Sequence, residues 1–508
     1  MLNATPFLRR YAEYRAFRRG LKSPADTQTA TLLSLVQKAS ATDFGKAHGF
    51  DAIDTVARFQ EQVPIRTYDD FLAEYFAPHF PVLNNVTWPG QIPYFAVSSG
   101  TSTGRTKHIP VSRQMLRSNA RAGTGVLADH VTHYPKSDVL GGKSFLLGGS
   151  VAMDDLGEGV KSGDLSGIAR LNNPRWSTPF VFPSIQEALA SDWDKKMDRL
   201  AALSLNEPIK VIAGTPSWLL LFFERLSRVA GGERDIAALY PGLELMVYGG
   251  MSFRPYQQAF HRWFGSRTVD WREVYSASEG FVASADRGVD EGLRLNLDLG
   301  LFFEFVPLEE LGSPAPRRFW VGNAPPGEYA LILSTCAGLW AYSIGDVVEL
   351  LEGSPPRIIV TGRTSYYLSA FGEHLSGAEL EAAVLHAAAA IGAEVAEFAV
   401  TPLYPQPSRP EGQHLFAVEL DQLPDDAART LFCARLDDAL AAGNEDYEVH
   451  RRGSVQLLAP DVVMLPKGAF ARWMESRGKL GGQNKVPRVL TEGPVRDSFL
   501  AFVEAARG

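Results

Sequence analysis

Short apolar runs alternate with longer amphipathic segments through most of the chain. Runs at 145–147, 211–213, 245–248 and 273–275 have the length and composition of buried strands, and each is followed by Gly or Ser. Segments at 184–204, 216–230 and 253–264 carry apolar residues at helical spacing. This alternation predicts an α/β fold with a substantially parallel sheet, in which ligands bind at the carboxyl ends of strands.

The pattern changes near residue 350. A turn at 352–356 and a strand at 358–360 precede a smaller α+β region. In that region the sequence predicts a helix at 376–390, strands at 395–401 and 414–420, a proline-rich loop at 402–413 and a helix at 425–442. We therefore predict two domains, residues 1–361 and residues 362–508.

Composition and charge exclude several classes of protein. A hydrophobic content of 45% argues against a disordered chain, and a net charge of -8 argues against a basic nucleic-acid-binding face. The two cysteines, Cys336 and Cys433, exclude a disulfide framework. No apolar run approaches the roughly 20 residues that a bilayer-spanning helix needs, and the arginine-rich N-terminus predicts an ordinary helix. We expect a cytoplasmic protein without nucleic-acid or membrane partners.

A hydroxyl-rich loop follows the strand predicted at 94–97. It reads Ser98-Ser99-Gly100-Thr101-Ser102-Thr103-Gly104-Arg105-Thr106-Lys107 and leads into a second predicted strand at 108–111. Hydroxyl groups and exposed backbone N–H groups bind phosphate oxygens, and a lysine neutralises their charge. A flexible surface hairpin is the alternative. We favour a phosphate site formed by Ser98, Ser99, Thr101, Ser102 and Lys107.

This loop resembles the first signature of adenylate-forming enzymes, and in detail that of the Gretchen Hagen 3 family of acyl acid–amido synthetases. The resemblance extends from about residue 5 to the end of the chain. It implies a large N-terminal α/β domain that binds ATP and an acyl acid, followed by a smaller, mobile α+β domain.

Further segments resemble the signatures of this family, in the family's order. The resemblance assigns the adenine pocket to Gly249, Gly250, Met251 and Tyr275, the second signature to Ser276, Ser278 and Glu279, and the ribose to Asp346. It places the interdomain hinge at Gly362-Arg363, and Ser276, Ser278 and Arg363 are also predicted to bind the nucleotide. Near the C-terminus, 481–488 resembles the element that carries a mobile lysine, here Lys485. The chain departs from the family at Ser343, where Arg is common, and at Glu373-His374, so the roles of these positions stay open.

The resemblance implies a two-step reaction. ATP first adenylates a carboxylic acid, and the amine of an amino acid then takes the acyl group and releases AMP. Lys485, Glu279 and Ser99 are the predicted catalytic residues, and Glu279 is also the predicted Mg²⁺ ligand. An acyl-CoA ligase and a non-catalytic nucleotide-binding protein are the alternatives. We expect a monomer or a weak homodimer.

Overall fold

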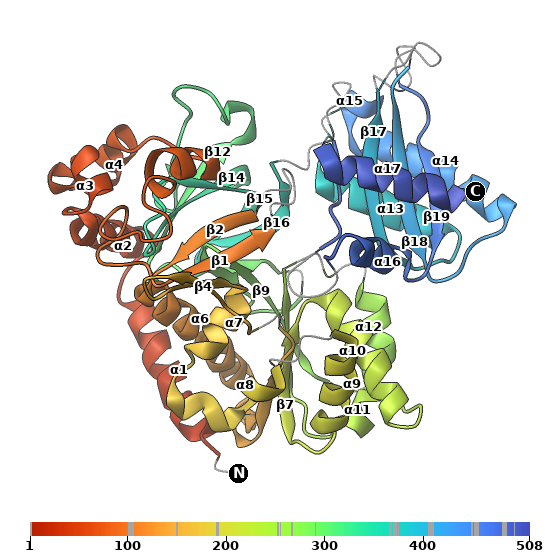
Figure 1. Ribbon diagram of the computed structural model, residues 1–508, viewed down its shortest axis with the longest axis horizontal. Coiled ribbons are helices and arrows are strands. Elements are labelled where there is room, and N and C mark those ends of the chain that lie inside the picture. Colours follow the sequence, from red (N-terminus) through yellow and green to blue (C-terminus); the bar gives the residue numbers. More distant parts are fainter. Residues whose placement is uncertain are drawn as a thin grey trace. The chain divides into compact units, whose positions relative to one another are not determined.

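The computed structural model divides into two compact units (Figure 1). The chain passes from the first unit to the second between Ile359 and Val360, and Gly345–Val347 also groups with the second unit. The domain boundary after residue 361 stays a prediction about which residues move together. The structure describes residues 3–99, 106–148, 151–188, 193–250, 253, 256–265, 268–289, 291–364, 368, 373, 375–404, 411–448, 451, 457–479, 485–491 and 493–507.

The helices and strands of the two units have the following bounds. The helices before the boundary are α1 (Thr5–Gly20), α2 (Pro24–Ala39), α3 (Asp43–Ala47), α4 (Val56–Gln62), α5 (Tyr68–Phe71), α6 (Arg113–His133), α7 (Leu165–Leu171), α8 (Ile185–Ala188), α9 (Trp193–Ser204), α10 (Pro216–Val229), α11 (Ile236–Leu239) and α12 (Gln257–Phe264). The strands before or at the boundary are β1 (Tyr94–Ser99), β2 (Thr106–Val111), β3 (Lys143–Leu146), β4 (Asp154–Gly157), β5 (Val160–Gly163), β6 (Val181–Phe182), β7 (Ile209–Gly214), β8 (Leu245–Gly249), β9 (Asp270–Ala277), β10 (Gly280–Ser284), β11 (Leu293–Leu295), β12 (Leu301–Pro307), β13 (Phe319–Trp320), β14 (Gly327–Thr335), β15 (Tyr342–Leu351) and β16 (Arg357–Arg363). The later elements are α13 (Gly377–Ala390), β17 (Val395–Leu403), β18 (Gln413–Leu420), α14 (Asp426–Gly443), α15 (Glu445–Glu448), β19 (Asp461–Pro466), α16 (Ala469–Ser476) and α17 (Gly493–Arg507).

The predicted parallel sheet forms one end of a 12-stranded sheet, where β6, β3, β7, β8 and β9 are parallel neighbours. Successive residues of β8 enter different cores. Leu245 packs in a core with residues of α1 and α6, whereas Met246 and Tyr248 pack with residues of α10 and α12. Because both faces are covered, the strand is apolar along its whole length. Figure 1 shows α9, α10, α11 and α12 grouped beside β7.

The other end of this sheet corrects the expectation of a substantially parallel sheet. Neighbours β9 and β10, β10 and β11, β11 and β16, β12 and β13, and β12 and β14 are antiparallel. Only two residues separate β9 from β10, and so short a connection joins antiparallel strands alone. The helix predicted at 253–264 is also shorter, because α12 begins at Gln257.

The hydroxyl-rich segment joins two adjacent strands, as predicted. The strands β1 and β2 are neighbours in a separate four-stranded sheet with the order β2-β1-β5-β4. The connection itself, 100–105, lies outside the described residues.

The second unit holds the predicted α+β region, built on the sheet β17-β18-β19. Phe416 and Val418 of β18 pack in one core with residues of α13 and α14, whereas Leu415 and Ala417 pack in another with residues of α16 and α17. Ser376 caps α13 in a reciprocal capping box with Glu379, at the predicted start of this helix. In the described part of the chain, no helix has both the length and the apolar character that a membrane span requires.

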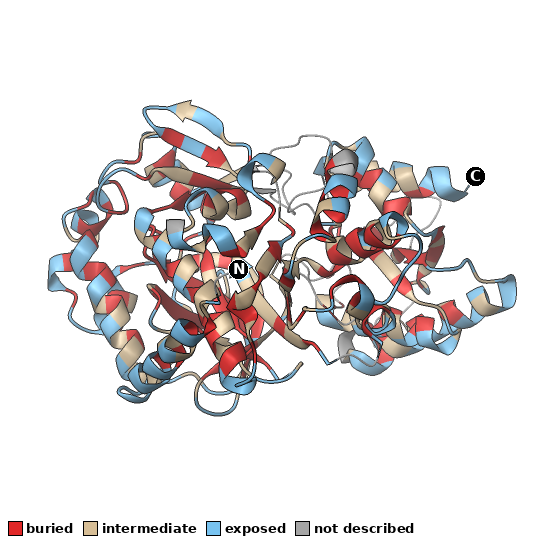
Figure 2. Ribbon diagram, turned by 90° about the horizontal axis from the view of Figure 1, so that it is seen from below, coloured by how far each residue is buried: buried red, intermediate tan, exposed pale blue. Residues whose placement is uncertain are grey.

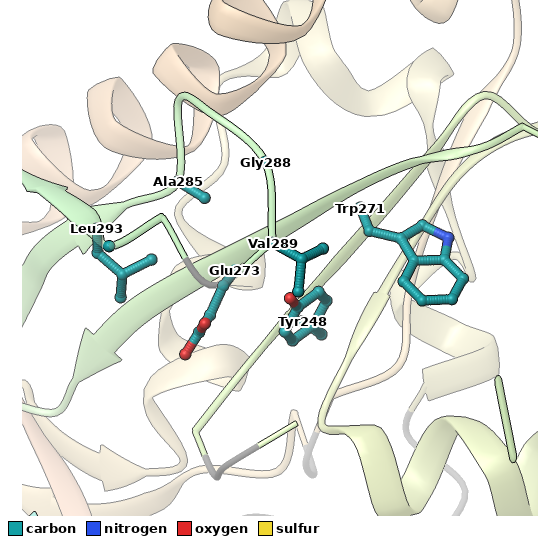
Figure 3. Close-up of a pocket in the computed structure, with 8 residues that line it drawn as sticks. Tyr248, Trp271, Glu273, Ala285, Gly288, Val289 and Leu293 are labelled. Carbon is teal, nitrogen blue, oxygen red and sulfur yellow. The ribbon is translucent and has the colours of Figure 1, made fainter. Parts of the chain in front are cut away.

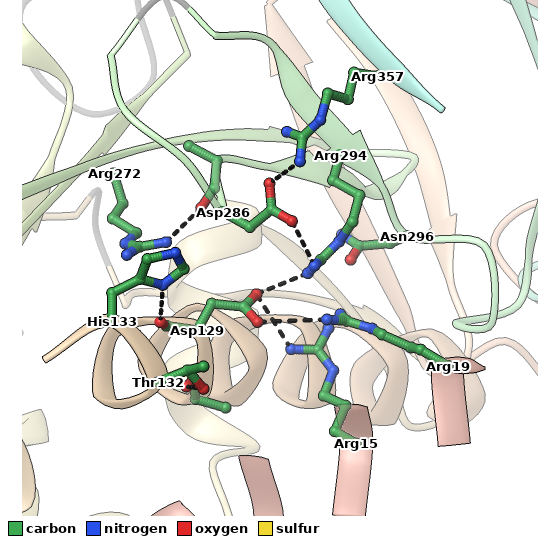
Figure 4. Close-up of polar contacts among 12 residues, drawn as sticks. Arg15, Arg19, Asp129, Thr132, His133, Arg272, Asp286, Arg294, Asn296 and Arg357 are labelled. Carbon is green, nitrogen blue, oxygen red and sulfur yellow. Dashed lines mark hydrogen bonds and ion pairs between the residues drawn. The ribbon is translucent and has the colours of Figure 1, made fainter. Parts of the chain in front are cut away.

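Buried positions follow the strands of each unit (Figure 2). A buried ionic network also ties α1 to α6 and to the sheet (Figure 4). Asp129 of α6 lies 3.6 Å from the Arg15 guanidinium, 3.4 Å from that of Arg19 and 2.7 Å from that of Arg294. Burial lowers the pKa of Arg15, and burial together with the neighbouring guanidinium groups lowers the pKa of Arg19 to about 10. Asp129 therefore balances several cations that are withdrawn from water.

We predict that Asp129→Asn lowers the free energy of unfolding by about 3–5 kcal/mol, because the variant keeps the shape but leaves buried cations without their counter-charge. Urea denaturation monitored by circular dichroism measures this change. Asp54→Asn is the matched control, since Asp54 pairs with Arg58 in an exposed i,i+4 ion pair, and its loss costs less than about 1 kcal/mol. A similarly small loss of unfolding free energy in both variants would contradict the role of Asp129 as a buried counter-charge.

Candidate functional site

The carboxyl ends of β8 and β9 bring two predicted site segments side by side. Gly249 pairs with Val274, the residue before Tyr275. A Cβ atom on Gly249 would lie 2.1 Å from the Val274 carbonyl oxygen, so only glycine permits this approach of the two strands. Gly250 follows with a φ of +85°. Gly249 thus has a packing role that sequence reasoning missed, and Met251 lies outside the described residues.

The turn between β9 and β10 carries the second predicted segment. Tyr275 is half-buried against the large core, Ser276 is exposed, Ser278 is half-buried, and Glu279 is only 9% exposed. Gly280 follows Glu279, and a Cβ atom there would lie 3.0 Å from Leu301 Cδ2. The close packing behind this turn leaves the Glu279 carboxylate buried rather than in solvent, in contrast to an ordinary loop acid.

Tyr342 contacts the Glu279 carboxylate directly. Its hydroxyl group donates a hydrogen bond of 3.2 Å to Glu279 Oε1, in a buried environment. Tyr342 lies four residues before the predicted ribose-binding residue Asp346, and the sequence indicated no role for it. The only available signal was its aromatic side chain, because the two positions are 63 residues apart in the sequence.

Asp346, Arg363 and Lys485 come together in the second unit. Asp346 Oδ1 lies 2.8 Å from Arg363 Nε. The Thr364 N–H donates a 2.8 Å hydrogen bond to the Gly345 carbonyl group, which ties the two segments together at the backbone. Gly345 has a φ of +84°, a conformation that favours glycine immediately before the carboxylate.

Lys485 lies within the electrostatic influence of this ion pair. Burial lowers the pKa of its ammonium group to about 8; the Arg363 charge acts in the same direction, and the Asp346 charge opposes it. Three residues predicted from three separate segments are therefore electrostatically linked.

The segment that carries Lys485 is anchored to β17. The Arg488 guanidinium pairs with Glu397, lies 4.3 Å from the centroid of the Phe398 ring, and donates a 2.9 Å hydrogen bond to the Phe398 carbonyl group. The Val400 N–H donates to the Arg488 carbonyl group at 2.8 Å. These contacts fix the backbone three residues beyond Lys485.

The phosphate loop is described at its two ends. The backbone of Ser98 and Ser99 belongs to β1, whereas Thr101 and Ser102 lie outside the described residues. Lys107 Nζ lies 5.5 Å from the centroid of the Tyr68 ring. The assignment of these residues to phosphate stays a prediction.

Two cavities are too small for a nucleotide, whose pocket takes roughly 300 Å³ or more. One, of about 10 Å³, is bordered by Tyr248 of β8, Trp271 and Glu273 of β9, and Val289 and Leu293 (Figure 3). A volume of this size holds one water molecule at most. The other, of about 160 Å³, is bordered by residues of 321–326 and 350–356. Neither cavity includes a predicted site residue.

Other candidate groups are accounted for by packing. Within the described residues, no three His, Cys, Asp or Glu side chains cluster as a metal site. Glu373 Oε1 lies 2.9 Å from His414 Nε2, and both residues are buried in the second unit, whereas His374 lies outside the described residues. Burial raises the pKa of the Cys336 thiol to about 12, which keeps it protonated and poorly nucleophilic.

Three family models match the chain: the GH3 family N-terminal domain at residues 13–269, the GH3 family central domain at residues 295–363, and the GH3 family C-terminal domain at residues 378–494. Probable indole-3-acetic acid-amido synthetase GH3.2 of Oryza sativa subsp. japonica is 23% identical, over 92% of this chain and 88% of that protein. Indole-3-acetic acid-amido synthetase GH3.3 of Arabidopsis thaliana is 26% identical over 39% of this chain, and the alignment spans about a third of that protein, 34%.

Solved structures share the fold. GH3.15 acyl acid amido synthetase superposes with a TM-score of 0.80 at 16% identity and covers 94% of this chain and 93% of its own. A 2-hydroxyisobutyryl-CoA ligase in the postadenylation state superposes with a TM-score of 0.64 at 14% identity, over 94% of this chain and 91% of its own. These likenesses confirm the predicted fold class, a large N-terminal α/β unit of the adenylate-forming type followed by a smaller α+β unit.

We predict that Lys485 reacts with an amine-selective acylating reagent near neutral pH. With a pKa of about 8, about half of its amine is unprotonated at pH 8, against well under about 1% for an ordinary lysine. Peptide mass spectrometry after brief labelling between pH 6 and 11 measures the profile, with the exposed Lys467 as internal control. Asp346→Asn moves the midpoint to lower pH, because it removes the charge that raises this pKa. A midpoint above pH 10 would contradict the geometry around Lys485.

Proposed function

We propose that this chain, which belongs to the GH3 family, uses ATP to adenylate a carboxylic acid and then transfers the acyl group to the amine of an amino acid. The products are an amide, AMP and pyrophosphate. The relatives named as amido synthetases support the reaction class. One observation in the molecule carries the proposal: residues from separate signature segments interact, Glu279 through a hydrogen bond from Tyr342 in one unit, and Asp346 through an ion pair with Arg363 and an electrostatic influence on Lys485 in the other.

The chemistry explains why a carboxylic acid needs ATP. A free carboxylate would have to expel oxide, which is a poor leaving group. Attack of the carboxylate oxygen on the α-phosphorus forms an acyl-adenylate, expels pyrophosphate and makes AMP the next leaving group. Negative charge builds on phosphoryl oxygens during this step, so the protein contributes mainly by positioning the reactants and by stabilising charge.

Glu279 fits the requirements of a Mg²⁺ ligand. Mg²⁺ prefers oxygen ligands, and ATP sites use one or two protein carboxylates together with phosphate oxygens. A buried carboxylate in a turn, in a described region without any cluster of several acidic residues, matches that pattern. When bound, the ion would neutralise part of the phosphate charge. We assign the ribose hydroxyl groups to Asp346 and the phosphates to Ser98, Ser99, Thr101 and Ser102, with Lys107 as an additional cation.

Lys485 is the proposed cation of the adenylation step. Its protonated ammonium group would stabilise the charge that develops between the acyl oxygen and the α-phosphate. Gly362 and Arg363 are the proposed hinge, and they form the end of β16. Rotation of the small domain about this point would exchange the adenylation arrangement for one that admits the amine, as conformational steps do in other enzymes.

The acceptor separates this proposal from its nearest alternative. An acyl-CoA ligase shares the first step, and a CoA ligase shares the fold at a TM-score of 0.64. The more similar GH3.15 fold, the three family models and the names of the curated relatives favour an amine acceptor. A non-catalytic nucleotide binder is disfavoured because it has no use for a lysine with a lowered pKa near Asp346 and Arg363.

We further propose that the protein is a cytoplasmic enzyme that acts as a monomer or a weak homodimer.

We predict that purified protein with ATP and Mg²⁺ shows acid-dependent exchange of labelled pyrophosphate into ATP for a subset of carboxylic acids. With an active acid, a mixture of amino acids is expected to accelerate AMP release, whereas CoA is not. Mass spectrometry then identifies the conjugate. Acceleration by CoA alone would favour the ligase alternative, and tight ATP binding without turnover on a broad acid panel would favour the non-catalytic one.

We predict that Lys485→Ala lowers the rate of pyrophosphate exchange by about 10²–10³, the effect of removing one stabilising donor. Lys467→Ala is the matched control, because Lys467 is exposed. Since the ammonium form is the active one and its pKa in the free protein is about 8, the wild-type exchange rate at subsaturating ATP and acid falls as pH rises through about 8. An unchanged rate in Lys485→Ala would remove this residue from the mechanism.

A further inference from the structure

The contact between Tyr342 and Glu279 joins two signature segments inside one unit. Tyr342 is fully buried and begins β15, and Glu279 is 9% exposed in the turn after β9. The hydroxyl hydrogen of Tyr342 is donated to Glu279 Oε1 over 3.2 Å. A hydrogen bond to one carboxylate oxygen restricts rotation about the last torsion of the glutamate, so it fixes the direction of both oxygens.

Tyr342 is itself held firmly on its other side. Its ring centroid lies 6.1 Å from that of Phe71, inside the aromatic part of the large core. Its backbone pairs with Arg66: the Arg66 N–H donates to the Ala341 carbonyl group at 3.0 Å, and the Ser343 N–H donates to the Arg66 carbonyl group at 2.8 Å. The phenol hydroxyl therefore projects from a rigid base.

The residue before Tyr342 is in an unusual conformation. Ala341 has a φ of +43°, although it is not a glycine, and it is fully buried. Its N–H donates a 2.9 Å hydrogen bond to Ser334 Oγ, and its carbonyl group accepts from Arg66. A strained backbone conformation of this kind persists only where surrounding contacts hold it in place, and such conformations are concentrated at functional sites. Here it sets the direction in which the next side chain leaves the backbone.

We infer that Tyr342 is a positioning residue, which orients the Glu279 carboxylate toward Mg²⁺ and the phosphates of ATP. The inference rests on the proposed function of Glu279 as the metal ligand. Partners that orient a metal-ligating carboxylate change metal affinity by about 10–100-fold when they are removed. The role belongs to the hydroxyl group, since the ring of Tyr342 serves the core.

Tyr342→Phe tests the inference because it removes one oxygen atom and leaves the ring. Mn²⁺, which replaces Mg²⁺ and is visible by electron paramagnetic resonance, is titrated into the protein with a non-hydrolysable ATP analogue. We expect the Mn²⁺ dissociation constant to rise about tenfold, and the Mg²⁺ concentration that half-saturates pyrophosphate exchange to rise in parallel. The maximal exchange rate at saturating Mg²⁺ changes by less than about threefold, because added metal restores occupancy.

Tyr329→Phe is the matched control. Tyr329 is a buried tyrosine of the same core, and its hydroxyl group donates to the Pro325 carbonyl group at 3.0 Å. It is expected to lose a similar amount of thermal stability with Mn²⁺ affinity unchanged. An unchanged affinity in Tyr342→Phe, or an equal loss in both variants, would overturn the inference.

Two further measurements separate positioning from a general structural role. If Tyr342 acts through Glu279, Tyr342→Phe causes no additional loss of Mn²⁺ affinity in a Glu279→Gln background, and a full additional loss contradicts that route.

If Tyr342→Phe does not fold, Ala341→Gly replaces it. This variant keeps the hydroxyl group but no longer fixes the direction of the Tyr342 side chain, and Mn²⁺ affinity falls at least about threefold. Unchanged affinity in Ala341→Gly would also overturn the inference.

The metal titration also separates this inference from the proposed function, since it needs no turnover. Mn²⁺ affinity that depends on the Tyr342 hydroxyl in a protein that activates no acid would sustain the inference and reject the acid-activation proposal. Normal acid activation in Tyr342→Phe, with unchanged dependence on Mg²⁺ and Mn²⁺, would sustain the acid-activation proposal and reject the inference about Tyr342.

Discussion

Strand β15 is the element on which the candidate site depends most. At its start Tyr342 holds the Glu279 carboxylate, and four residues later it carries Asp346, which pairs with Arg363. Two departures from regular strand geometry make this possible, a φ of +43° at Ala341 before the strand and a φ of +84° at Gly345 within it. Each departure sets the direction of the functional residue that follows. One segment thus fixes two carboxylates with different proposed ligands, a metal ion and a ribose.

Local patterns predicted the parts of the fold that are decided locally. The short apolar runs at β7 and β8 predicted strands of a parallel sheet, and the parallel pairing of β7 with β8 and of β8 with β9 confirms this. The capping residues predicted the start of α13 at Ser376. The order of the signature segments indicated the family. For the strands and the helix start, the information lies within a few neighbouring residues, because periodicity and capping act at that range. Each signature segment is likewise short, and only the order of these segments extends along the chain.

Features that depend on distant pairs could not be predicted. The antiparallel half of the large sheet requires pairings such as Leu293 with Ile358, which no local pattern specifies. The resemblance assigned Gly249 to the adenine pocket, but its packing requirement comes from the Val274 carbonyl group of the next strand. The contact of Tyr342 with Glu279 spans 63 residues. Arg363 was predicted as a hinge residue and as a cofactor-binding residue. Its pairing with Asp346 was not predicted, because that pairing depends on the end of β16 lying beside Gly345 of β15.

The charges around Lys485 explain why a lysine suits the proposed step. Arg363 and Lys485 place two cations near one carboxylate, Asp346, and burial together with Arg363 lowers the pKa of the lysine to about 8. An ammonium group in such surroundings is stabilised by any additional anion, and the phosphoryl group of an acyl-adenylate supplies one. The same attraction stabilises the negative charge that forms on the phosphoryl oxygens during adenylation. The lowered pKa therefore agrees with the proposed catalytic role. Because the positive charge of Lys485 is not fully neutralised in the free protein, it can stabilise the negative charge of a bound phosphate.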